Sequence, residues 1–184
     1  MRTIAVYLAT LCVQHTIIEP SLFDWCVYSI EKRIISILSW IFLFFIGSSL
    51  FGIAETCVFL TSFLWLRKST NGYHASSYLG CISLSLLVEI VCLLTAPHLP
   101  HSAANAVVLL ADALIYLYAP HNDIKIHLST AELVALRSRS RQLLLFFNAL
   151  YIFLSCFRSS PANYIAMALI ADAVSLLFSK NDTP

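Results

Sequence analysis

One short polar segment holds a histidine and a cysteine, the pair of residues in this chain best suited to covalent chemistry. It reads Arg67-Lys-Ser-Thr-Asn-Gly-Tyr-His-Ala-Ser-Ser-Tyr-Leu-Gly-Cys81 and lies between two long apolar stretches. A thiol attacks only as the thiolate, and at neutral pH a neighbouring imidazole is the usual group that takes its proton. His74 and Cys81 are therefore candidates for a base and its nucleophile.

The spacing of this pair constrains the local structure. In one regular helix, seven residues would separate the two side chains by about 10 Å, too far for a proton transfer. We therefore expect the helix with Cys81 to begin after His74, near residues 75–77, with segment 71–74 folded back. The imidazole can then approach the sulfur to about 3 to 3.5 Å. The Asn-Gly dipeptide permits this reversal, and a serine at the helix start can cap it.

The segment resembles the signature of the accessory gene regulator B (AgrB) family, integral-membrane cysteine endopeptidases that process the precursor of a cyclic quorum-sensing peptide in Gram-positive bacteria. A second similarity is Tyr118-Ala119-Pro120, where an apolar helix runs into a basic loop. The order of the apolar segments also agrees from about residue 30 onwards. The resemblance implies that His74 and Cys81 are the catalytic pair and that Arg67 and Gly72 are motif positions.

The resemblance also implies a substrate and an assembly. The expected partner is an AgrD-like amphipathic precursor peptide whose acidic C-terminal tail is cut off through a thioester on Cys81. A cysteine of the peptide would then close a thiolactone ring, without a cofactor. The family suggests a homodimer in the bacterial cell membrane. Asn71 stands where many members have a second glycine, a change that the turn tolerates.

Composition places the chain in the membrane. Of its 184 residues, 59% are hydrophobic and 11% charged, and the mean hydropathy is +0.82. A soluble domain carries roughly twice that share of charge. The six cysteines are scattered through apolar stretches without a CxxC pair, which argues against a disulfide or zinc framework.

The first 33 residues are predicted to form interfacial helices. Apolar residues recur at helical spacing from Ile4 to Ile18 among polar ones, which is typical of a weakly amphipathic helix lying in the membrane interface. Glu19-Pro20-Ser21 interrupts it, and a second helix is expected from Leu22 to Lys32. A signal peptide at residues 2–13 is the alternative, although no small-residue cleavage site follows it at the right distance.

The remaining chain predicts an all-α, polytopic membrane protein with six transmembrane helices in one domain, 1–184. The predicted spans are 34–49, 52–66, 78–96, 103–119, 142–157 and 162–178. Basic pairs at Lys32-Arg33 and Arg67-Lys68 flank the apolar run 34–66, and basic residues collect on the cytoplasmic side. Both ends of that run are then inside, so it forms a hairpin with a turn at 47–52. Both chain termini and the polar segment with Cys81 are cytoplasmic in this topology. A version with four spans, in which 34–66 crosses once, is the alternative.

Four carboxylates within the predicted membrane segments allow more than one interpretation of their role. Asp112 and Asp172 lie at a similar depth, roughly 10 Å below the cytoplasmic face, and either could orient His74. The alternative is that each only bonds neighbouring helices. A small membrane transporter or channel subunit would instead use Glu55 and Glu89 together with these aspartates as pathway carboxylates.

The loop 120–141 carries the largest basic excess in the chain, including Arg137, Arg139 and Arg141. Such a cluster sets topology and contacts anionic headgroups. A further hypothesis is that it attracts the acidic tail of the precursor. His98 and His101 suit adjacent metal ligands on a helix, but no third ligand follows them. No HExxH pair of a metalloprotease and no GxGxxG, Walker or aspartate-rich phosphotransfer pattern is found, and no nucleic-acid partner is expected.

Overall fold

The regular structure of the chain is helical. The computed structural model describes residues 2–73, 78–122, 129–157 and 160–180, and within them it contains α- and 3-10 helices and no strand. The predicted all-α class is therefore confirmed. Contacts divide the chain into two compact units, Met1–Phe45 and Ile46–Pro184.

The first unit pairs α1 (Arg2–Gln14) with the start of α2 (Phe23–Phe51), after the 3-10 turn η1 (Pro20–Leu22). Its small core joins Ala5 and Ala9 of α1 to Cys26 and Val27 of α2. Ile4, Tyr7 and Leu8 of α1 are exposed, whereas its two alanines are fully buried, so the helix packs mainly through Ala5 and Ala9. Its placement in the membrane interface stays a prediction.

Helix α2 runs without interruption through Lys32 and Arg33, where a boundary between two helices was expected. That boundary is wrong. No glycine or proline occurs between Pro20 and Gly47, so nothing interrupts the backbone hydrogen bonds of the helix over this stretch. A charged pair marks a change in hydropathy, and it does not by itself end a helix.

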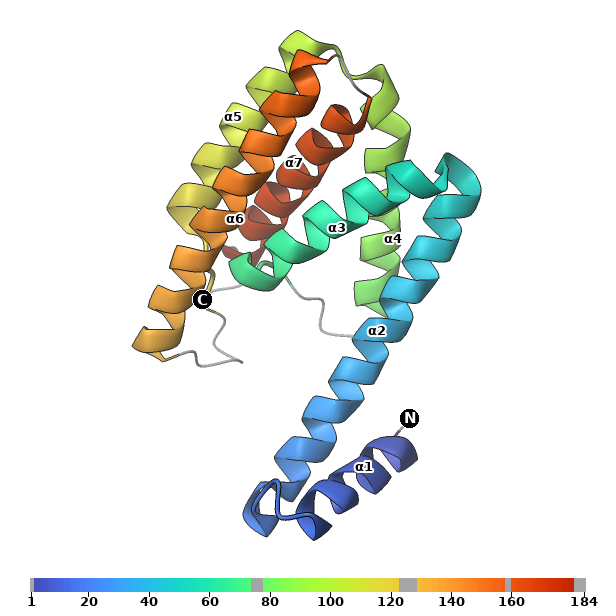
Figure 1. Ribbon diagram of the computed structural model, residues 1–184, viewed down its shortest axis with the longest axis vertical. Coiled ribbons are helices and arrows are strands. Elements are labelled where there is room, and N and C mark those ends of the chain that lie inside the picture. Colours follow the sequence, from blue (N-terminus) through green and yellow to red (C-terminus); the bar gives the residue numbers. More distant parts are fainter. Residues whose placement is uncertain (1, 74–77, 123–128, 158–159, 181–184) are drawn as a thin grey trace. The chain divides into compact units, whose positions relative to one another are not determined.

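The second unit is a helical bundle around the C-terminal helix. Its elements are α3 (Ile53–Thr70), α4 (Tyr78–Thr95), η2 (Ala96–His98), α5 (His101–Tyr118), α6 (Thr130–Cys156) and α7 (Pro161–Lys180). Helix α7 contacts α3, α4, α5 and α6 (Figure 1). The core of this second unit includes Ala111, Ile115, Phe147, Ile165 and Leu169. Any side chain on the inner face of α7 therefore lies among residues from several helices.

Local sequence signals set the helix boundaries in this unit. Gly52, with φ of 103°, separates α2 from α3 within the expected turn at 47–52. Asn71 ends α3 in the left-handed conformation, with φ of 52°, and its N–H bonds the carbonyl of Arg67. Ser129 and Glu132 form a capping box at the start of α6. Residues 130–141, expected to be loop, are thus the first turns of α6.

Four helical stretches are long and apolar enough to cross a membrane: Pro20–Phe51, Leu79–His98, His101–Tyr118 and Pro161–Ser179. The chain is therefore a membrane protein, whereas six crossings are not confirmed. Helix α3 includes three charged residues, Glu55, Arg67 and Lys68, in its 18 positions. Helix α6 begins with a polar, arginine-rich half. Both helices nevertheless pack against α7 within the bundle.

Candidate active site

The C-terminal end of α3 is bound to two segments that are distant in sequence. Thr70 Oγ1 donates a hydrogen bond of 2.9 Å to Asp172 Oδ1 on α7. The backbone N–H of His121, just after α5, donates to the carbonyl of Thr70 at 2.9 Å. Asn71 Nδ2 donates in return to the carbonyl of His121 at 2.8 Å. The Tyr118-Ala119-Pro120 segment therefore leads directly into the polar segment that begins at Arg67.

Gly72 lies where there is no room for a side chain. A Cβ atom there would overlap Arg67 Nη1 and would come within 2.6 Å of Ser175 Oγ on α7. Its φ is outside the left-handed region, so space and not backbone conformation requires glycine here. Arg67 Nη1 donates a hydrogen bond to Ser175 Oγ over this residue. The next backbone N–H, that of Tyr73, donates to the carbonyl of Ser175 at 3.2 Å.

His74 lies outside the described residues, as do residues 75–77 where the start of the next helix was expected. Tyr73, which is held by Ser175, is its immediate neighbour. The direction of the backbone entering His74 is therefore fixed by α7, while the predicted distance between imidazole and sulfur stays a prediction.

Cys81 is the fourth residue of α4 and is partly exposed, with a free thiol. It is close enough to Arg67 for their charges to interact. Burial lowers the pKa of the Arg67 guanidinium, and the negative charges of Asp172 and of a Cys81 thiolate oppose this shift. An arginine stays protonated in proteins. Arg67 is thus a partly buried cation on which the charges of Asp172 and of a Cys81 thiolate act.

The two aspartates expected at a similar depth have different surroundings. Asp172, on α7, is fully buried next to the C-terminal end of α3, and its Oδ2 has no hydrogen-bond partner among the described atoms. Asp112, on α5, is half-buried beside Asn148 of α6, with which it interacts. Of the two, Asp172 belongs to the network around Arg67.

Glu89 lies in a separate buried group. Its side chain is buried on α4 near Thr56 of α3, and both carboxylate oxygens lack a hydrogen-bond partner among the described atoms. A Cβ on Gly47 would meet Glu89 Oε1 and would lie 2.7 Å from Thr56 Cγ2. Glu89 is eight residues beyond Cys81 on α4, about 12 Å along the helix. It is therefore no part of the site at the end of α3.

The three arginines do not form one patch. They lie on the exposed part of α6. Arg137 and Arg141 are one turn apart on the same side, whereas Arg139 is about 200° away around the axis from Arg137. The Arg141 guanidinium sits 4.3 Å from the ring centroid of Tyr116 on α5. Two of the three therefore share a face.

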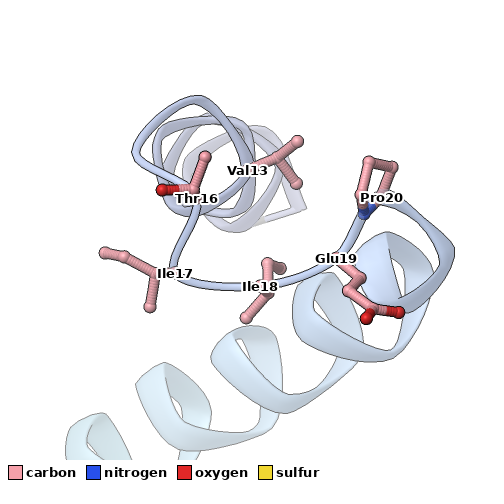
Figure 2. A pocket seen from close by; sticks show the side chains of 6 residues that line it. All are labelled: Val13, Thr16, Ile17, Ile18, Glu19 and Pro20. Carbon is pink, nitrogen blue, oxygen red and sulfur yellow. The ribbon is translucent and has the colours of Figure 1, made fainter.

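The described residues contain no group of His, Cys, Asp and Glu side chains that could hold a metal ion, and His98 and His101 are not joined there by a third ligand. A hollow follows α1 in the first unit and is lined by Val13, Thr16, Ile17, Ile18, Glu19 and Pro20 (Figure 2). This lining has no nucleophile. The chemistry-bearing residues are those at the end of α3 and the start of α4.

Sequence reasoning missed Thr70 and Ser175. Each bonds a residue on another helix: Thr70 lies within the polar segment without an assigned role, and Ser175 is part of no motif with fixed spacing. Ser175 follows Asp172 by three residues, so both face the same side of α7. That spacing is the signal that could have identified Ser175.

These features define a helical membrane protein in which the end of α3, with its partly buried guanidinium, is bonded to α7, and a free thiol lies at the start of α4. The chain belongs to the accessory gene regulator B family: the family model described as "AgrB: Accessory gene regulator B" matches residues 4–178. The resemblance is therefore confirmed over nearly the whole chain. Neither the search of curated proteins nor that of solved structures gave a match. Membership of this family fits a role in processing a quorum-sensing peptide, and the family is associated with an AgrD-type precursor.

Proposed function

We propose that this protein is a membrane-embedded cysteine endopeptidase that removes the C-terminal tail of a quorum-sensing pro-peptide and promotes its cyclisation to a thiolactone. Two observations support the proposal. The first is the family membership, and the second is the network of hydrogen bonds that holds segment 67–73, whose Arg67 interacts with Cys81. The second carries it furthest, because a nucleophilic thiol needs nearby positive charge and a base held in position.

In the proposed first step, His74 takes the proton of Cys81 and the sulfur attacks the peptide carbonyl that precedes the tail. A C–S bond forms, the C–N bond breaks, and the protonated His74 gives its proton to the leaving amine. The peptide remains as a thioester on Cys81. A cysteine of the peptide then attacks the thioester carbonyl and displaces Cys81, which yields the thiolactone. Because the thioester on Cys81 is replaced by the thioester of the thiolactone ring, the free energy changes little in this step.

Arg67 has a natural role in this step. In the proposed mechanism, its positive charge stabilises the negative sulfur of Cys81 before attack. The developing oxyanion of the peptide carbonyl would form next to the same sulfur, within reach of backbone N–H groups at the start of α4. Gly72 contributes by leaving space for the guanidinium.

Asp172 is the proposed partner of His74. Its Oδ1 accepts from Thr70, while its buried Oδ2 is without a partner among the described atoms. A carboxylate oxygen that accepts the second ring proton of a histidine fixes the ring and stabilises the imidazolium. The preceding residue, Tyr73, is bonded to Ser175, which is one turn beyond Asp172 on α7.

We also propose that all six helices from α2 to α7 cross the membrane, with both termini and the active site on the cytoplasmic side and with a homodimer as the assembly. The packing of α3 and α6 against α7, itself a candidate span, supports this count. The test is labelling of single cysteines by a membrane-impermeant maleimide in intact cells. A cysteine at Leu99 should react from outside and one at Asn122 should not, and the reverse pattern would contradict the topology.

The basic face of α6 is proposed to attract the acidic tail of the precursor. Arg137 and Arg141 share a side, so the double change to Glu should weaken precursor binding more than Arg139→Glu alone. Binding is measured with a fluorescent precursor and the protein in nanodiscs, at low and high salt. Equal affinities for the two variants and the wild type would remove this part of the proposal.

The decisive experiment mixes the protein in liposomes with a precursor peptide and follows tail release by mass spectrometry. Cys81→Ala and His74→Ala should release no tail, whereas Cys57→Ala and Cys156→Ala should match the wild type, because these are exposed cysteines elsewhere in the bundle. The wild type should also show a peptide adduct on Cys81 that hydroxylamine removes. Tail release by Cys81→Ala would refute the proposed function.

A further inference from the structure

Ser175 is in contact with the candidate site at two of its atoms. Its hydroxyl oxygen accepts a hydrogen bond from Arg67 Nη1, and its carbonyl accepts the N–H of Tyr73. We propose that Ser175 is a positioning residue of the peptidase: it fixes one conformation of the Arg67 guanidinium and holds the backbone of Tyr73, the residue before His74. This inference rests on the proposed function, and it adds a residue on α7 that no sequence motif includes.

A neutral acceptor suits this position. Arg67 is partly buried, and the negative charges of Asp172 and, more weakly, of a Cys81 thiolate act on its guanidinium. A carboxylate that held the guanidinium directly would neutralise much of its charge. Thr70 instead engages Asp172 Oδ1, and the uncharged hydroxyl of Ser175 holds Arg67 Nη1. The bond to Ser175 therefore fixes the guanidinium without adding a second negative charge to that of Asp172.

Gly72 links this contact to the sequence motif. The guanidinium reaches Ser175 by passing over Gly72, and any Cβ there would overlap Arg67 Nη1 and press on Ser175 Oγ. The glycine of the motif and the serine of α7 thus serve the same purpose, which is to fix one conformation of Arg67. A long, flexible side chain loses effectiveness when it samples several rotamers.

The first test compares two substitutions of equal shape. Ser175→Thr keeps a hydroxyl, and Ser175→Val replaces that hydroxyl with a methyl group. Tail release is measured under single-turnover conditions at varied precursor concentration. We expect Ser175→Val to lower the rate at saturation about tenfold with an unchanged half-saturating concentration, and Ser175→Thr to stay within about threefold of the wild type. Ser155→Ala is the matched control, because Ser155 Oγ has no partner among the described atoms.

The second test asks whether Ser175 acts through Arg67. If it does, Ser175→Val should cause no further loss in an Arg67→Met background, since the group that it positions is already missing. A substrate-free readout uses a variant in which Cys81 is the only remaining cysteine. The rate of its alkylation by iodoacetamide at pH 7 should fall equally in Ser175→Val, Arg67→Met and the double variant.

These experiments separate two kinds of failure. If the wild type releases no tail, the proposed function fails, and the alkylation rates still decide whether Ser175 and Arg67 act on Cys81. If tail release depends on Cys81 but Ser175→Val matches Ser175→Thr in both assays, the role of Ser175 is refuted. Losses that multiply in the double variant would also refute it, because the two residues would then act independently.

Discussion

Replacing Gly72 with alanine tests the packing at the site directly. The new Cβ would lie 2.6 Å from Ser175 Oγ, whereas ordinary contacts begin at 3.4 Å, so the atoms must separate by most of an ångström. Overpacking of this kind costs about 1 to 3 kcal/mol, and loss of the bond between Arg67 and Ser175 adds about 1.5 to 3 kcal/mol. If most of that energy is lost from the transition state, the rate of tail release falls roughly 100-fold or more.

The assay is single-turnover tail release in liposomes, with thermal unfolding in detergent as a control for folding. The cost of overpacking can be separated from the cost of the lost hydrogen bond, because Ser175→Ala removes the oxygen that the new Cβ would meet. Gly72→Ala should therefore cost less in a Ser175→Ala background than in the wild type. The reasoning is refuted if Gly72→Ala keeps activity within threefold of the wild type, or if its cost is the same in both backgrounds.

Three further predictions follow from the described contacts. Asp172→Asn should lower the rate of tail release at least 100-fold, because the amide nitrogen cannot accept a ring proton from His74, while Asp112→Asn should change it by less than about threefold; equal effects would contradict the assignment. Asn71→Gly should retain activity and lose about 1 kcal/mol of the free energy of unfolding, because it removes only the hydrogen bond to the carbonyl of His121. Asn71→Val, forced into φ near 52°, should lose about 1 to 3 kcal/mol more in denaturant titrations. Ser129→Ala should destabilise the start of α6 by about 1 kcal/mol at pH 7. Hydrogen bonds from the backbone and side chain of Ser129 lower the pKa of Glu132, so their contribution is present above the unfolded-state pKa and is lost as the pH falls through the folded-state value. The difference in Tm between wild type and Ser129→Ala should therefore shrink in acid.

Local signals gave most of the helix boundaries. The turn at Gly52, the end of α3 at Asn71 and the short connection before α5 all follow from glycine, asparagine or proline at that position. The two incorrect predictions, a helix boundary at Lys32-Arg33 and a loop at 130–141, have a common origin. The change in charge at Lys32-Arg33 and at 130–141 predicts a helix boundary, yet the helix continues through both stretches because no residue there interrupts it.

The sequence by itself determined the membrane class, the all-helical fold, the family and the residues of the polar segment, since composition, hydropathy and a local motif are properties of consecutive residues. Only the tertiary structure decided which distant groups meet that segment. The packing of the helices places Asp172, and not Asp112, in the network around Arg67. It also brings His121 into contact with Thr70 and Asn71. Ser175 joins the site through its bond to Arg67. The physical reason is that burial and hydrogen bonding between helices depend on how α7 packs against α3, and no spacing along the chain encodes that contact.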